Sequence, residues 1–166
     1  MSRLVVTGRR ARAVTAVAAL GLLLPLGACA SASTAVEACM AKQATSVSSV
    51  DLTGTYTGKD EAKAVTMTLK PAGGRSGGTV TVHNWPTGDW YKSELGDTFN
   101  GSGTWQVDYS GGPGDPPQVD LSFTEPRLFL DGYTIDKLSI AMDSTRTYLY
   151  KNDDPDACPA FRLKKR

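Results

Sequence analysis

From Leu52 onward, apolar and polar residues alternate in short runs that are separated by turn-forming residues. Strict alternation puts one face of a strand in the core and the other in water, so each run predicts a half-buried β-strand. The runs lie near residues 52–56, 65–69, 80–82, 105–109, 119–123, 133–142, 147–150 and 161–163.

These runs predict an all-β domain over residues 50–166. No helix-length segment of about 10–15 residues separates them, which argues against a parallel α/β fold. Short connections favour an antiparallel meander, and about eight strands can close into a small barrel that leaves no exposed edge. A sandwich of two small sheets is the alternative.

A helical period precedes the strands. Val36, Cys39 and Met40 recur at helical spacing, and Gln43 continues the pattern. This spacing predicts one short helix over about residues 35–45, with Cys39 on its apolar face. Helix and linker together would occupy residues 34–49.

Residues 1–28 have the composition of a targeting segment. Four arginines precede an apolar stretch over residues 13–26. That stretch is shorter than the roughly 20 residues that span a bilayer. A basic start, a short apolar core and small residues at the exit are typical of a secretory signal peptide.

The end of this segment, Leu26-Gly27-Ala28-Cys29, resembles the lipobox of bacterial lipoproteins. The resemblance implies that the Cys29 thiol receives a lipid and that cleavage makes Cys29 the new N-terminus, followed by a flexible leader over residues 29–33. The chain would then be anchored on the extracytoplasmic face of the cell membrane. Gly27 is less usual at its position than Ala or Ser. An ordinary signal peptide with an Ala-x-Ala cleavage site is the alternative.

The charge balance bears on the class of partner. Arg3, Arg9, Arg10 and Arg12 account for four of the 18 Lys and Arg, whereas all 17 Asp and Glu follow the signal, so the exported part has a net charge of −3. Nucleic-acid binding relies on basic patches that neutralise phosphates. We therefore predict no nucleic-acid partner, and expect a monomer.

The chain has three cysteines. If lipid occupies Cys29, then Cys39 and Cys158 remain, and outside the cytoplasm such a pair is expected to be oxidised. We predict a disulfide that ties the start of the domain to its end. Two free buried thiols are the alternative. A metal site is disfavoured because the chain holds a single histidine and no Cys-x-x-Cys.

Several short segments carry a further resemblance: Leu52-Thr53-Gly54-Thr55-Tyr56, Gly101-Ser102-Gly103-Thr104-Trp105, Leu121-Ser122-Phe123, Tyr148-Leu149-Tyr150 and Asp154-Pro155-Asp156. Together they resemble a group of small actinobacterial cell-envelope lipoproteins with a lipocalin-like β-barrel. Tyr56 departs from that pattern, in which Trp is more usual, and the Cys39–Cys158 pair is not required by it. The resemblance implies an architecture and a location rather than a reaction.

Catalytic motifs are weak in this sequence. Gly101-Ser102-Gly103 lacks the spacing of a nucleophile elbow and leads into a predicted strand. Any Ser-His-Asp triad would have to use His83, which lies at the end of a predicted strand. Such a histidine is more often a solvated surface residue, so no catalytic residue is assigned.

Asn152, Asp154 and Asp156 alternate like the first ligands of a calcium-binding loop. Ala157 stands where the turn glycine of that loop belongs, and Leu163 where its bidentate glutamate belongs. A turn capped by Asx side chains explains the same residues. No metal or cofactor is predicted.

Trp85, Trp90 and Tyr91 lie in a segment of loop character that ends near residue 98. Loops on rigid barrels often carry function, and exposed aromatic rings there would stack on a sugar, a peptide or an apolar ligand. Alternatively, Trp85 and Trp90 plug one end of the barrel. From the sequence we expect a non-enzymatic binding or interaction module of the cell envelope; an envelope hydrolase acting on glycan or ester substrates is the alternative.

Overall fold

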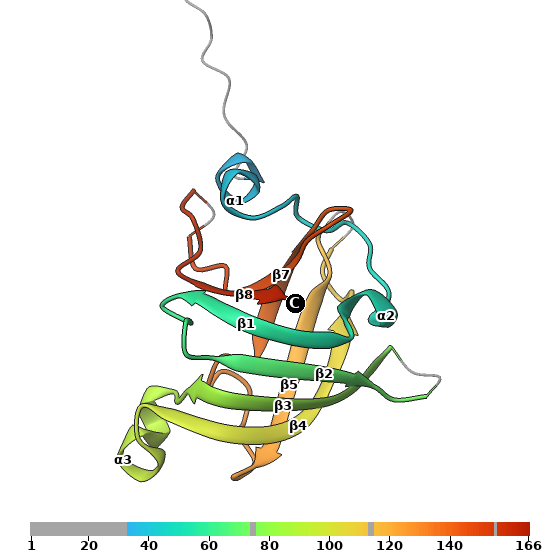
Figure 1. The fold of residues 1–166 in the computed structure, drawn as a ribbon. Helices are drawn as coiled ribbons and strands as arrows, with labels where there is room; N and C mark the ends of the chain where they lie inside the picture. Colours follow the sequence, from blue (N-terminus) through green and yellow to red (C-terminus); the bar gives the residue numbers. More distant parts are fainter. Residues whose placement is uncertain (1–32, 74–75, 113–114, 155) are drawn as a thin grey trace, which may run out of the picture.

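The computed structural model describes residues 33–73, 76–112, 115–154 and 156–166 (Figure 1). The predicted signal peptide and Cys29 lie outside these residues. The elements in chain order are α1 (Ser33–Cys39), α2 (Ser49–Leu52), β1 (Gly54–Asp60), β2 (Thr66–Pro71), β3 (Gly77–Pro86), the 3₁₀-helix η1 (Asp89–Tyr91), α3 (Lys92–Leu95), β4 (Thr98–Asp108), β5 (Gln118–Glu125), β6 (Lys137–Met142), β7 (Thr147–Tyr150) and β8 (Phe161–Lys165).

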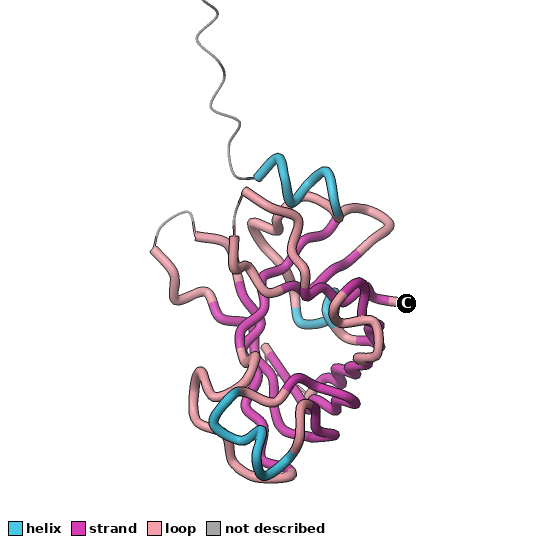
Figure 2. The backbone as a smooth tube through the Cα atoms, turned by 90° about the vertical axis from the view of Figure 1, so that its left-hand side faces the viewer, coloured by secondary structure: helices cyan, strands magenta, loops and turns pink. Residues whose placement is uncertain are grey.

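The eight strands form one closed barrel (Figures 1 and 2). Each strand pairs antiparallel with its neighbour in the chain, and β1 pairs with β8 to close the sheet. Closure satisfies the backbone groups that an edge strand would leave unpaired. The predicted antiparallel barrel is therefore confirmed, and the sandwich alternative is wrong.

The alternation of the sequence determines the interior. On β3, Val80 and Val82 are fully buried, whereas the alternating Thr79 and Thr81 are exposed. Inward residues from all eight strands join Leu52 in one apolar cluster. The largest side chains of this cluster that are almost inaccessible to solvent include Trp85, Tyr56, Phe123, Met67, Leu69 and Leu163.

A second cluster lies on the outside of the barrel. Val36 and Met40, from α1 and the residue after it, pack against Tyr148 and Tyr150 of β7. Strand β7 is therefore buried on both faces, because Leu149 between the two tyrosines points into the barrel.

The predicted disulfide is present and fixes α1 in this position. Cys39 at the end of α1 is bonded to Cys158 in the β7–β8 connection, with the two Cα atoms 5.9 Å apart. The barrel, both apolar clusters and the disulfide all lie within residues 33–166. This part of the chain thus contains a complete core of its own.

The structure differs from the sequence prediction first in the N-terminal helix. The helix ends at Cys39 rather than near residue 45, because the following segment is extended and pairs with β6. Gln43 forms a β-bridge with Ala141, and the Ala44 N–H donates to the Ile140 carbonyl at 2.9 Å. The end of β6 beyond Ser139 is available for this pairing, because β5 pairs with β6 only over residues 137–139.

The second difference lies in the predicted run over residues 133–142. Only residues 137–142 form a strand, β6, and Thr134 makes just an isolated bridge to Thr87. Residues 133–135 instead belong to the connection that covers one end of the barrel. Within the described residues, no helix has the length and apolar character needed to cross a membrane.

Candidate functional site

Trp85, one of the three aromatic residues singled out in the sequence, lies in the barrel core. Its side chain is fully buried, with ring centroids 5.7 Å from Phe123 and 5.4 Å from Phe161. The indole N–H donates to the Ile135 carbonyl at 3.0 Å. This indole is thus inaccessible to a ligand and closes the interior beneath the residue 133–135 segment.

A β-bulge gives this tryptophan its inward direction. Between Val82 and the tryptophan, His83 and Asn84 on β3 face Asn100 alone on β4. Asn84 adopts a φ of 53°, its backbone N–H donates to the Asn100 side chain, and its amide donates to the Ala64 carbonyl, both at 3.0 Å. The extra residue in β3 shifts the inward–outward alternation by one position. Val82 and Trp85, three positions apart, therefore both point inward.

The other two residues of the set, Trp90 and Tyr91, lie on η1 at the same end of the barrel. Tyr91 is half-buried, and its ring packs edge-on against Phe129 at 5.2 Å and against Tyr133 at 5.6 Å. Trp90 is 77% exposed, and its ring centroid lies 5.9 Å from that of Tyr133. The name aromatic end is used below for the set Trp90, Tyr91, Arg127, Phe129 and Tyr133.

Further contacts fix the aromatic end. The Arg127 guanidinium carbon lies 4.2 Å above the Tyr91 ring, and Arg127 also forms an ion pair with Glu94 of α3. Gly88 approaches the β5–β6 connection so closely that a Cβ there would lie 1.6 Å from the Tyr133 carbonyl oxygen. The backbone before Trp90 therefore packs directly on the connection, and the indole is presented from an ordered support.

Exposed apolar side chains gather on the segments of this end. Besides Trp90, Leu128 is 64% exposed and Leu130 is 59% exposed, on either side of Phe129. Phe129 points inward and stacks on Phe99 with a centroid distance of 5.0 Å. Clustered exposed apolar residues are typical of interaction surfaces rather than of ordinary solvated loops.

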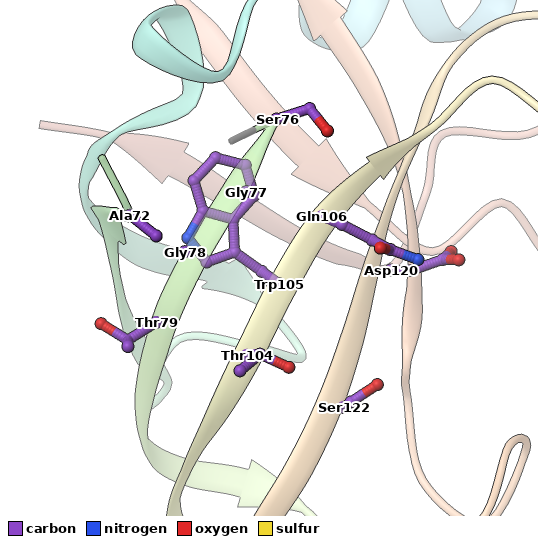
Figure 3. A pocket seen from close by; sticks show the side chains of 10 residues that line it. All are labelled: Ala72, Ser76, Gly77, Gly78, Thr79, Thr104, Trp105, Gln106, Asp120 and Ser122. Atoms are coloured by element: carbon purple, nitrogen blue, oxygen red, sulfur yellow. The ribbon is translucent and has the colours of Figure 1, made fainter. Parts of the chain in front are cut away.

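A second candidate surface is a polar groove on the outer face of β3, β4 and β5 (Figure 3). Its volume is about 610 Å³. The polar side chains that line its strands are Thr79, Thr104, Gln106, Asp120 and Ser122, and these five residues define the groove below.

Strand register aligns these five side chains. Thr79 is the cross-strand partner of Thr104, which in turn faces Ser122, and Gln106 faces Asp120. Directly opposed residues lie on the same face with Cβ atoms about 5 Å apart. The arrangement therefore forms two short rows, one of three hydroxyls and one of an amide beside a carboxylate.

Asp120 has the unusual environment in this groove. One carboxylate oxygen, Oδ1, is buried and has no hydrogen-bond partner within the protein. Burial raises the pKa of Asp120, while the nearby Lys137 ammonium opposes that rise. A buried acceptor without a donor costs about 1–3 kcal/mol, so the Asp120 carboxylate is poorly solvated at this oxygen.

The structure does not bring His83 into a catalytic constellation. His83 is exposed on the outside of β3, opposite Thr66. In the acidic turn before β8, the Asp154 carboxylate accepts from the Asp156 backbone N–H at 2.9 Å, and Lys151 pairs with Asp153 at 2.9 Å. Among the described residues, no group of three or more His, Cys, Asp or Glu side chains could hold a metal ion.

No protein-family model, curated protein or solved structure matches this chain. The function is therefore inferred from the fold and from the two candidate surfaces described above. A small closed barrel with a filled interior is compatible with a binding module, in which the ligand or partner contacts the outside or one end.

Sequence reasoning did not identify the polar groove. Thr104 and Gln106 were recognised only as the solvent-facing residues of a predicted strand. The sequence feature that could have indicated the groove is the kind of side chain at these outward positions. They hold Thr, Ser and Gln, where an exposed strand often carries long charged residues. That signal acquires meaning only when the register places β3, β4 and β5 side by side.

Proposed function

We propose that this protein is an exported lipoprotein, held on the outer face of the cell membrane by lipid on Cys29, and that it acts as a non-enzymatic binding module of the cell envelope. The binding role is supported above all by Trp90, which is 77% exposed and stands on a support packed by Tyr91, Phe129 and Tyr133. Because that support is already ordered, a partner that covers the indole avoids much of the entropy cost of fixing it.

The position of the aromatic end supports this proposal. Figures 1 and 2 place α1 and α3 at opposite ends of the molecule. Only three residues separate Cys29 from the first residue of α1, and four residues span at most about 14 Å. A lipid on Cys29 would thus keep α1 near the bilayer, with Trp90 directed away from it toward the envelope.

The proposed contact can be tested by site-specific crosslinking. A photoreactive phenylalanine analogue replaces Trp90 or Leu128 in the full-length protein, expressed in the native host, and the adducts are identified by mass spectrometry. Thr81, exposed on the wall of the barrel at β3, is the control position. The proposal predicts one shared adduct from positions 90 and 128.

The same adduct should be absent at position 81, and Tyr91→Ala should weaken it by loosening the support. Equal adducts at all three positions, or none at positions 90 and 128, would contradict a binding role for the aromatic end.

A further inference from the structure

We propose that the polar groove on the outer face of β3, β4 and β5 is a binding site for a neutral saccharide. This site is separate from the aromatic end, and the inference does not depend on the lipid anchor. The arrangement of the five groove residues, the half-buried carboxylate of Asp120 and the charges around it support this site.

The groove offers hydrogen-bonding groups of both kinds on a rigid support. The hydroxyls of Thr79, Thr104 and Ser122 each donate and accept, the Gln106 amide does both, and ionised Asp120 accepts only. All five lie on strands that are hydrogen-bonded to their neighbours. A sugar ring, with adjacent hydroxyls that donate and accept, matches this dense mixture better than a ligand of one hydrogen-bonding type.

Asp120 supplies the directional contact. Its Oδ1 is buried without a partner, and Gln106 is directly opposite on β4 (Figure 3). A hydroxyl donated to a carboxylate forms a charge-assisted hydrogen bond, which is stronger than a neutral one. Because Asp120 as a whole is only half-buried, a sugar hydroxyl would donate to the accessible part of its carboxylate, and a neighbouring sugar oxygen would accept from the Gln106 amide.

The charges argue against an ionic ligand. No Lys or Arg is among the described residues that line the groove, and the nearby Lys137 ammonium lies beside the Asp120 carboxylate, whose charge would repel a phosphate or carboxylate ligand. A cationic amine would have to compete with the Lys137 ammonium, since Lys137 is the cross-strand neighbour of Asp120 on β6. Of the other carboxylates near Asp120, those of Asp108 and Asp136 already accept hydrogen bonds, from Ser110 and Gly132 respectively.

The groove also predicts how tightly the sugar binds. Trp105 borders the groove but is only 2% exposed, because it belongs to the barrel core and its indole N–H donates to the Lys70 carbonyl at 3.1 Å. No broad aromatic platform is thus open for stacking. Binding would rely on hydrogen bonds exchanged with water, which favours weak affinity for each sugar unit.

The test is an NMR titration of residues 30–166, isotope-labelled and with the disulfide intact. Maltotetraose, cellotetraose, chitotetraose and mannotetraose are added separately at millimolar concentration, and a tetralysine peptide serves as the cationic probe. At least one tetrasaccharide should shift the backbone amides around positions 79, 104, 106, 120 and 122. Tetralysine should leave those amides unchanged.

Variants decide whether the groove carries the binding. Asp120→Ala should weaken the saccharide titration by about tenfold, the effect of losing one charge-assisted hydrogen bond. Thr57→Ala, which removes an outward hydroxyl from β1, two strands away from β3, should have no effect, and neither should Trp90→Ala. Asp120→Asn keeps the size of the side chain, so its amide spectrum shows whether the strand pairing is preserved.

The inference is wrong if none of the four tetrasaccharides shifts the groove amides, if only tetralysine does, or if binding survives Asp120→Ala unchanged. Because crosslinking at position 90 reports on a different surface, failure of the saccharide site and failure of the proposed aromatic contact can be told apart.

Discussion

Trp85 and Trp90, five positions apart, should differ strongly in how much unfolding free energy is lost when each is truncated to Ala. Trp85→Ala removes a fully buried indole that contacts Phe123 and Phe161. Truncating a core Trp to Ala typically costs about 3–5 kcal/mol of unfolding free energy, from lost burial and the cavity that remains. The Ile135 carbonyl also loses its donor, which places the expected cost in the upper half of that range.

Trp90→Ala removes an indole that is already 77% exposed. Its main packing partner is the Tyr133 ring, and an aromatic pair contributes about 0.5–1.5 kcal/mol. We expect a cost below about 1 kcal/mol, because solvent already covers most of the indole and weakens this pair.

The measurement is urea unfolding of residues 30–166, followed by far-ultraviolet circular dichroism so that the loss of a fluorophore does not matter. With a slope of about 1.5 kcal/mol/M, Trp85→Ala should lower the midpoint by about 3 M and Trp90→Ala by well under 1 M. Trp85→Phe keeps a ring but loses the hydrogen bond, and should fall between them. Similar midpoints for the two alanine variants would refute the distinction between a core residue and a surface residue.

Three other predictions concern the disulfide, an acidic turn and the anchor. Replacing both Cys39 and Cys158 by Ser should lower the unfolding free energy by about 2–5 kcal/mol, because the bridge closes a long loop; a change below about 1 kcal/mol in urea unfolding would oppose this. Hydrogen bonds from Arg146, and from a backbone N–H beside it, hold the pKa of Asp143 well below its usual value of 3.8. The ionised carboxylate therefore stabilises the fold above pH 3.8 and this contribution is lost as the pH falls below it, so Asp143→Asn should flatten the acid dependence of the thermal midpoint in that window. Cys29→Ser should move the protein from the membrane fraction to the soluble fraction of the native host, and unchanged retention would exclude the lipid anchor.

Much of the fold was predictable because alternation is a local property. A residue such as Val80 or Leu121 lies on the inner face wherever its strand is placed, so the apolar pattern identifies the core before the pairing is known. The Cys39–Cys158 bond was predictable for a different reason. Once the lipid is assigned to Cys29, only these two thiols remain, and their pairing requires no knowledge of distance.

The aromatic candidates were only partly resolved by the sequence. The sequence placed Trp85, Trp90 and Tyr91 near one end of the domain, but their spacing carried no information on which ring is exposed. The burial of Trp85 depends on the bulge at Asn84, and the left-handed backbone there is stabilised by Asn100 of β4 and the Ala64 carbonyl. Partners from other segments cannot be read from the local pattern.

The sequence by itself thus determined the class of fold, the inward residues of most strands and the disulfide. The tertiary structure alone decided between a closed barrel and a sandwich, and it alone showed the end of the helix at Cys39 and the polar groove. The physical reason is the range of the interactions. Side-chain direction along a strand repeats every two residues, whereas rows such as Gln106 beside Asp120 exist only after the register between strands is set.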